Sequence, residues 1–278
     1  MAMPHLETNG RKKNDLESGE PWARLDEELG HWQAAGRTAS LWWRDDDATA
    51  PGPLLERLLG ITEDAGAGLL LAVIPARAEP ALANGLGAHT CIAQHGYAHV
   101  NHAPRGQGLG AWELGSHRPR DQVLAELETG RERLATLFGA RFVPVVVPPW
   151  NHIDPGLFSS LAERGYIGIS AFGPRGAEAG RHGLNEVNAH CDPIRWKEAA
   201  RFAGEAKTIG SLIDHLRARR SREFDASEPS GFLTHHRDLD PPGWAFCQHL
   251  AGVIAAHPAA RWLGIREVFA GNISAAKK

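Results

Sequence analysis

Three consecutive aspartates, Asp45 to Asp47, stand in the segment "SLWWRDDDAT". The apolar residues before them predict a buried strand that ends at this cluster. Neighbouring carboxylates repel one another where water is scarce, so such a cluster usually needs a cation or a shared proton. The segment therefore predicts a cation site. A simple helix cap through Asp47 or Thr49, with Arg44 as the counter-charge, is the alternative, but it leaves two carboxylates unexplained.

The segment "HGYAH" places His95 and His99 four residues apart, a spacing that lets two imidazoles bind one metal ion. Alone, this spacing fits an ordinary solvated or hydrogen-bonded pair better. Together with one aspartate it forms a three-ligand set with open positions, which is typical of a catalytic metal site. No glutamate follows the first histidine, which excludes the HExxH pattern. The three cysteines form no CxxC pair, so neither a thiolate zinc site nor a disulfide framework is expected.

Three further segments carry groups suited to proton transfer or binding. "LTHH" ends with His235 and His236, and histidine exchanges a proton near neutral pH. In "VPPWN" the prolines stiffen the chain and could fix the Trp150 amide as an oxyanion donor. "DPIRW", residues 192–196, offers Asp192, Arg195 and Trp196. Exposed loop histidines, a packed tryptophan and a surface salt bridge, respectively, explain these segments about as well.

Short apolar segments alternate with helical patterns along the chain. Strands are expected at 38–44, 68–75, 89–96, 142–149, 166–173, 184–192, 230–236 and 261–265. Helices are expected at 51–66, 121–139, 154–165, 208–220 and 243–258. This alternation predicts a mostly parallel α/β sheet that readily closes into a barrel. The polar clusters all follow strands, so their side chains should meet at one end of the barrel. The basic run "RARRSR", 217–222, is expected to be a solvated helix end.

Length and composition favour one soluble domain. The chain has 278 residues, 42% hydrophobic residues and a formal net charge of −3, which gives no reason to expect nucleic acid as a partner. Residues 1–20 are polar and are predicted to form a disordered tail, and residues 21–278 a single domain. No segment resembles a signal peptide or a membrane span, so a cytoplasmic location without membrane association is expected. The oligomeric state stays open.

The ordered set of an aspartate cluster, HxxxH, a Pro-aromatic loop, an Asp-to-Trp segment and a late histidine resembles the polysaccharide deacetylase family. These are the NodB-homology carbohydrate esterases of family four, and the resemblance spans residues 39–265. It implies a distorted (β/α)7 barrel. It also implies removal of acetyl groups, mostly from N-acetylated sugars, with a divalent metal held by Asp-His-His.

The first two motifs of that family assign the metal triad and the base. "RDDDA" fits Thr-Phe-Asp-Asp-Gly, with Asp46 as general base and Asp47 as metal ligand, and leaves Asp45 without a role. "HGYAH" fits His-Ser/Thr-x-x-His, which makes His95 and His99 the other ligands. Gly96 then stands where the family carries a hydroxyl.

The later motifs depart from the family pattern. In "VPPW", Pro149 is kept, Trp150 replaces tyrosine, and Val147 replaces the arginine that orients the base. In "DPIRW", Arg195 stands where a second aspartate is expected. We therefore hypothesise that Arg195 substitutes for the lost guanidinium near Asp46, with Arg44 as the competing candidate.

The remaining site residues come from the fourth and fifth motifs. His235 corresponds best to the family's general acid, with His236 as a fallback. Pro149, Asp192, Trp196 and His236 are expected to contact substrate.

The resemblance predicts a metal-dependent hydrolase that removes acetyl groups from an N-acetylated or O-acetylated carbohydrate. Zinc is the first expectation, although iron, cobalt, nickel and manganese also suit two histidines and a carboxylate. The expected partner is an acetylated sugar or glycan precursor. An amide hydrolase with a non-sugar substrate and a non-catalytic carbohydrate-binding barrel are the alternatives.

Overall fold

The computed structural model describes residues 21–176, 180 and 182–270, and the predicted tail at 1–20 lies outside this part. Its helices are α1 (Pro21–Ala34), α2 (Pro53–Asp64), α3 (Arg120–Phe138), α4 (Phe158–Glu163), α5 (Glu205–Ser221), α6 (Pro241–Ala256) and α7 (Ile265–Ala270). Its strands are β1 (Ala39–Ala48), β2 (Leu69–Val73), β3 (Thr90–His95), β4 (Phe142–Val147), β5 (Gly168–Ile169), β6 (Asn185–Glu186), β7 (Ile194–Arg195), β8 (Arg201–Phe202), β9 (Ser230–Thr234) and β10 (Ala260–Trp262).

The parallel strands form a ring. β1 pairs with β9 on one edge and with β2 on the other, and the order then continues through β3, β4, β5 and β6. A bridge between Cys191, beyond β6, and Phe232 of β9 completes the circle, with Leu233 N donating to Cys191 O at 2.8 Å. The predicted (β/α)7 barrel is therefore confirmed. β10 pairs with the first residues of β1, Ala39 to Leu41, and shares the edge that β2 uses further along.

Alternation along β1 separates the barrel interior from the helix layer. Trp42 packs with Leu70, Ala72 and Val145, which are inner residues of neighbouring strands, and with α7, which closes the barrel at this end. Trp43 points the other way and packs against Phe232 and Trp262 under the helices. Both indoles are fully buried, so neither contacts a ligand. Arg44 and Asp46 therefore continue the inner face, and Asp45 faces the helices.

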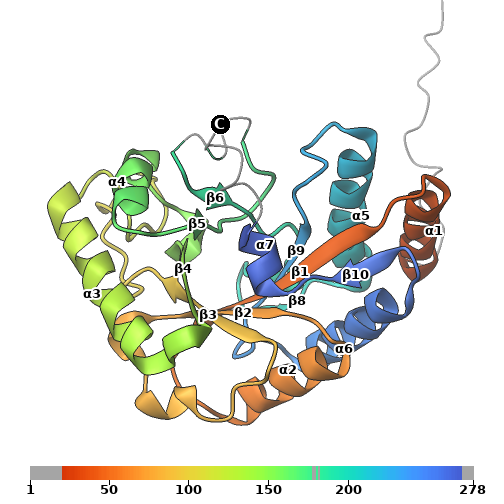
Figure 1. Ribbon diagram of the computed structural model, residues 1–278, viewed down its shortest axis with the longest axis horizontal. Helices are drawn as coiled ribbons and strands as arrows, with labels where there is room; N and C mark the ends of the chain where they lie inside the picture. The colour runs from red at the N-terminus through yellow and green to blue at the C-terminus, as the bar shows by residue number, and fades with distance from the viewer. Residues whose placement is uncertain (1–20, 177–179, 181, 271–278) are drawn as a thin grey trace, which may run out of the picture.

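Except for α7, which covers one end of the barrel, the helices surround the strands on the outside (Figure 1). The sequence did not indicate α1, whose Leu25, Leu29 and Trp32 are buried against the sheet and α5. The expectation of a solvated "RARRSR" segment was wrong for Arg219, which is 2% exposed and donates to Ser40 O and Ser230 Oγ. Its neighbour Arg220 pairs with buried Glu28 of α1 at 2.8 Å. The segment thus joins α5 to β1, β9 and α1.

The cysteines and the helices also bear on what the composition predicts. Cys91, Cys191 and Cys247 are free thiols, as predicted. Within the described residues, the helices are too short or too polar to cross a bilayer.

Candidate functional site

A β-bulge at the end of β1 separates the three aspartates. The sequence placed them after the strand, but β1 continues through Ala48, and its register with β2 shifts between Asp45 and Ala48. Asp47 adopts a left-handed backbone with φ 69°, which is uncommon for a residue other than glycine. The bulge re-aims the side chain of Asp47, so the three carboxylates have three different surroundings.

Asp45 faces the helix layer and holds the chain segment after β9. Its Oδ2 accepts hydrogen bonds from the Thr234 hydroxyl at 2.7 Å and from the His236 N–H at 2.9 Å. Its Oδ1 lies 2.5 Å from His236 Nδ1. Asp45 is fully buried and His236 is 4% exposed, and although burial opposes it, the charge and hydrogen bond of Asp45 raise the pKa of His236 and so favour a buried ion pair. Asp45 therefore fixes the backbone on both sides of His235.

Asp46 faces the barrel interior and is held by Arg44. Arg44 Nε lies 2.9 Å from Asp46 Oδ1, and Arg44 Nη2 donates to Asp46 Oδ2 at 3.1 Å. The other donors of the guanidinium bind Asn151 Oδ1 at 2.8 Å and the carbonyl and hydroxyl of Ser170, both at 2.8 Å. Both Nη atoms donate hydrogen bonds and Nε lies in ion-pair contact with Oδ1, so the guanidinium is anchored and orients Asp46.

The hypothesis that Arg195 orients Asp46 is wrong in this structure. The Arg195 side chain is 40% exposed and pairs with Glu198 at 3.6 Å, in the hairpin of β7 and β8. Arg44, the competing candidate, supplies the guanidinium. It comes from the strand that carries Asp46, two residues earlier on the same inner face.

Asp47 lies between the two histidines of "HGYAH". Its Oδ1 is 3.1 Å from His95 Nε2 and 3.3 Å from His99 Nε2. His95 Nδ1 lies 2.9 Å from the carbonyl of Val147, which places the ring proton on Nδ1 and leaves the Nε2 lone pair toward Asp47. Three donors of the types that bind zinc and similar ions thus converge on one point, and this geometry fits a divalent cation.

These groups open into a pocket of about 280 Å³ at the carboxyl ends of the strands. His235, Asp192 and Trp196 line its far wall, and the Trp196 ring meets the His235 ring edge-on at 4.6 Å. Trp196 Nε1 donates to Asp192 Oδ2 at 2.9 Å. The His235 Nδ1 atom is buried and has no hydrogen-bond partner among the described residues. An imidazole without a hydrogen-bond partner among these residues therefore lines the same pocket as Asp47, His95 and His99.

The loop after β4 provides the remaining wall. Trp150 and Asn151 both adopt left-handed backbones, with φ 53° and 59°, and both line the pocket. The Trp150 ring lies 4.3 Å from the His99 ring. Two consecutive left-handed residues without glycine store strain, which is common where a loop must aim side chains at a site.

Local charges shift the pKa values of the triad. Burial alone would raise the pKa of Asp47, but the hydrogen bond and charge of His95, with the charges of His235 and His99, lower it below its usual value. Burial opposes protonation of His95, yet the charges of Asp46 and Asp47 raise its pKa. Burial and the charge of His95 lower the pKa of His99. Burial also raises the pKa of Asp192.

The predicted substrate contacts divide into two groups. Asp192 and Trp196 line the pocket as expected. His236 does not, because Asp45 binds it on the helix side of β9; this corrects its predicted roles in substrate binding and as the fallback acid. Pro149 is buried and packs against Gly96, so it shapes the loop without lining the pocket.

Sequence reasoning missed Asn151, Ser170 and Glu113. The first two bind Arg44, and only their position after strands could have drawn attention to them. Glu113 is fully buried and accepts hydrogen bonds from the backbone of the "HGYAH" loop.

A second group, His190, His215 and Glu228, also brings nitrogen and oxygen atoms together, away from this pocket. Here Gly231 N–H donates to His190 Nδ1 at 2.9 Å, so neutral His190 carries its proton on Nε2, 3.4 Å from Glu228 Oε1. The His190 and His215 rings stack at 3.4 Å. A protonated Nε2 cannot bind a metal, and the lone pairs of stacked rings do not converge. This group is a buried hydrogen-bond network.

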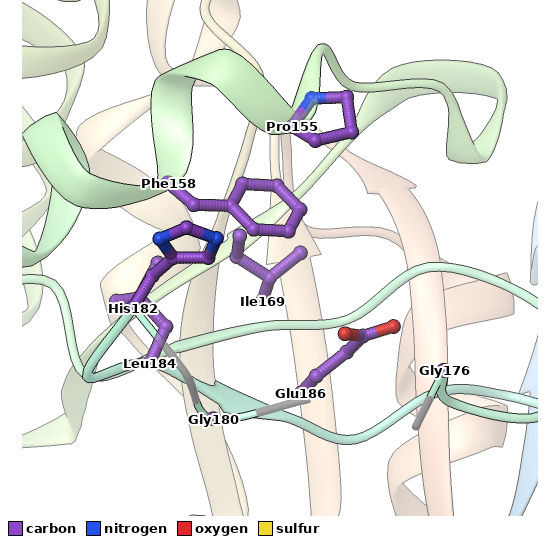
Figure 2. A pocket seen from close by; sticks show the side chains of 8 residues that line it. All are labelled: Pro155, Phe158, Ile169, Gly176, Gly180, His182, Leu184 and Glu186. Atoms are coloured by element: carbon purple, nitrogen blue, oxygen red, sulfur yellow. The ribbon is translucent and has the colours of Figure 1, made fainter. Parts of the chain in front are cut away.

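A hollow of about 290 Å³ lies between α4 and β6 (Figure 2). Phe158 and His182 meet edge-on at 5.8 Å on one wall, and Glu186 lies apart from them. Its lining shares no residue with the pocket of the Asp47 triad.

Comparison with solved structures identifies the fold. A candidate polysaccharide deacetylase from Mycobacterium smegmatis matches with a TM-score of 0.61 and 19% identity, over 87% of this chain and 92% of the other. The chain has the polysaccharide deacetylase fold. A peptidoglycan N-acetylglucosamine deacetylase matches with a TM-score of 0.53 and 15% identity, over 84% and 90% of the two chains.

A family 4 carbohydrate esterase from Streptomyces lividans has a TM-score of 0.51 and 17% identity, over 81% and 91%. No family model matches the sequence, and no curated protein is similar to it. At these identities, the likeness concerns the fold.

Proposed function

We propose that this protein is a metal-dependent hydrolase that removes an acetyl group from an N-acetylated or O-acetylated carbohydrate. The observation that carries this proposal is the convergence of Asp47, His95 and His99, in a pocket that a guanidinium-bound carboxylate, Asp46, and His235 also line. The deacetylases that share the fold support the reaction class.

Asp47 Oδ1, His95 Nε2 and His99 Nε2 would hold one divalent cation, and zinc is the ion we propose. When bound, such an ion lowers the pKa of water from about 16 to about 7 and polarises an acyl carbonyl. The triad provides only three ligands, which leaves room for water and substrate.

Two groups that line the pocket, Asp46 and His235, would transfer the protons. Asp46, fixed by Arg44, accepts a proton from the attacking water as general base. His235 donates a proton to the leaving amine or alcohol as general acid. The Trp196 ring packs edge-on against the imidazole, and Asp192 holds Trp196 by accepting a hydrogen bond from its Nε1. The Trp150 backbone N–H is the proposed oxyanion donor, a contact that typically contributes about 10²- to 10³-fold in rate.

The pocket size and its two indoles suit an acetylated sugar or glycan precursor. Trp150 and the half-exposed Trp196 offer flat apolar faces on which a sugar ring can stack. A volume of about 280 Å³ accommodates one sugar unit with its acetyl group better than a long polymer segment.

The test combines metal analysis with acetate release. We expect about one divalent ion per chain, and acetate release from N-acetylated or O-acetylated monosaccharides and their short oligomers, such as those of N-acetylglucosamine. Asp47→Ala should lose both ion and activity. Asp46→Asn should keep the ion and lose about 10²- to 10⁴-fold in kcat.

Protein that binds an ion and cleaves simple acylated amides, but no acetylated sugar, would identify the substrate as non-carbohydrate. Protein that binds glycans without an ion and releases no acetate would overturn the hydrolase proposal in favour of a carbohydrate-binding barrel.

A further inference from the structure

Glu113 is a buried carboxylate without a cationic partner. Its side chain is fully inaccessible, and no lysine, arginine or histidine of the described residues forms a salt bridge with it. Its neutralising contacts are backbone N–H groups: Oε1 accepts from Ala98 at 2.8 Å and from Val100 at 3.5 Å, and Oε2 accepts from Tyr97 at 3.2 Å. A concave run of N–H groups of this kind binds an anion, and here the anion is a side chain of the same protein.

These N–H groups flank His99. Ala98 precedes it and Val100 follows it, while His99 itself has a left-handed backbone with φ 57°. A histidine rarely adopts this conformation unless its surroundings hold it there. Glu113 binds the peptide groups on both sides and so stabilises the turn that brings His99 Nε2 to 3.3 Å from Asp47 Oδ1.

Gly96 provides a second, independent observation. Its φ is 55°, and a Cβ atom built on it would lie 2.0 Å from Glu113 Oε2. The carboxylate therefore occupies the space that a side chain at position 96 would need. The loop is shaped around Glu113, and Gly96 makes room for it.

His95 does not depend on the same support. It is the last residue of β3, and the Val147 carbonyl fixes its ring. Asp47 is held by the bulge in β1. Of the three proposed ligands, only His99 lies on the loop that Glu113 binds, so the influence of Glu113 on the site should act through this ligand.

We propose that Glu113 is a positioning residue that holds His99 in its metal-binding orientation. This inference rests on the proposed function, because it presupposes that the triad binds an ion. Glu113 does not line the pocket, and among the described residues its carboxylate accepts hydrogen bonds only from the backbone of residues 97–100, although its charge also opposes the lowering of the His99 pKa.

The test measures metal affinity, with Zn²⁺ or Co²⁺ alone as the probe, by competition with a chelator in the full-length protein. Glu113→Gln keeps the size of the side chain but removes the charge and turns an amide N–H₂ toward backbone donors. We expect its dissociation constant for the ion to rise about 10- to 100-fold, as for other residues that support metal ligands. Glu113→Asp keeps the charge, and its dissociation constant for the ion should lie between those of the wild type and Glu113→Gln.

The Co²⁺ absorption spectrum adds a readout of ligand geometry. In Glu113→Gln the spectrum should change as His99 loosens, and it should resemble that of His99→Ala at subsaturating metal. Glu228→Gln is the matched control, because Glu228 is also fully buried and accepts backbone N–H groups, from Arg175 and Asn188, but lies before β9, away from the pocket.

Wild-type affinity and spectrum in Glu113→Gln would overturn the inference while leaving the proposed function intact. Equal loss of affinity in Glu113→Gln and Glu228→Gln would also overturn it, because the effect would then be one of general stability. If the wild-type protein itself bound no ion, the proposed function would fail first.

Discussion

Asp45 and His236 form a buried ion pair, 2.5 Å between Oδ1 and Nδ1, that joins β1 to the segment after β9. The pair lies on the helix side of the barrel wall, and His235, between Thr234 and His236, points to the opposite side, into the pocket. Asp45 thus fixes the backbone that presents the proposed acid, His235. Its neighbours Asp46 and Asp47 line the pocket themselves.

Asp45→Asn should destabilise the fold and misplace His235. Removing one partner of a buried pair leaves the other charge uncompensated, which typically costs about 3–5 kcal/mol. We expect a loss of about this size in the free energy of unfolding, measured by urea denaturation, and a lower kcat with the metal content unchanged. Replacing exposed Asp26, which lies 3.8 Å from His257, is the control and should change neither quantity. A stable, fully active Asp45→Asn would contradict the assignment.

The same pair gives stability a defined pH dependence. Burial opposes protonation of His236, but the charge and hydrogen bond of Asp45 raise its pKa above the usual value. The folded state therefore binds this proton more tightly than the unfolded state. Its contribution to stability is fully present below the unfolded pKa of about 6.5 and is lost as pH rises through the folded pKa. In His236→Gln the free energy of unfolding should no longer fall as the pH rises from 6 to 9, as measured by urea denaturation. If it fell as in the wild type, the loss of stability would come from other groups.

Arg44→Lys should slow catalysis. Lysine carries the charge but cannot form the fork that binds Asp46, Asn151 and Ser170 together. We expect kcat to fall about tenfold or more, a part of the 10²- to 10⁴-fold that a general base contributes. Metal content should stay at one ion per chain. Arg195→Ala is the comparison, because the Arg195 side chain is 40% exposed and, among the described residues, forms a salt bridge only with Glu198. The reverse result, a slow Arg195→Ala and a normal Arg44→Lys, would restore the original hypothesis.

The sequence predicted the order of strands and polar clusters along the chain. It also predicted that the clusters meet, because the strands of a parallel barrel all end at one face. The family resemblance added the ring of seven strands and the prediction that Asp47, His95 and His99 are the metal ligands. Orientation was harder to predict. The bulge at Asp46 and Asp47 decides which face each carboxylate meets, and nothing in "RDDDA" signals it.

Contacts between distant segments were not predictable either. Glu113 lies 14 residues beyond His99 in a loop without regular pattern, and its role depends on backbone N–H groups that any sequence has. Helix α1 was missed because it begins at Pro21, directly after the polar stretch, and its apolar face becomes clear only against α5.

The buried histidines of the second cluster predict acid sensitivity. Burial and the charges of His190 and Arg219 lower the pKa of His215 to about 2, and burial also lowers that of His190. Below pH 6.5 the unfolded state binds a proton at His215 that the folded state does not, so stability falls as pH decreases, and the lowered pKa of His190 acts in the same direction. His215 should contribute about 1.4 kcal/mol per pH unit between its unfolded and folded pKa values. His215→Gln should reduce the slope between pH 6 and 4.5 by about this amount in urea denaturation, and should still bind one metal ion per chain. Loss of an ion in this variant would show that the second cluster is a metal site.

Gly96→Ala tests the shape of the ligand loop. The new Cβ atom would lie 2.0 Å from Glu113 Oε2 and 2.6 Å from Pro149 Cγ, at a backbone angle that alanine disfavours. Overpacking and left-handed strain together should cost about 2–5 kcal/mol of folding stability and weaken metal binding. Gly106→Ala is the matched control, since Gly106 also has a positive φ, 79°, and lies in the same connection between β3 and α3, but no atom stands within 4 Å of its Cβ position. Gly106→Ala should lose only the folding stability that is due to backbone strain, about 1 kcal/mol, and should keep the wild-type metal affinity. Equal effects of the two substitutions would mean that backbone strain alone, and not the space taken by Glu113 and Pro149, requires glycine at position 96.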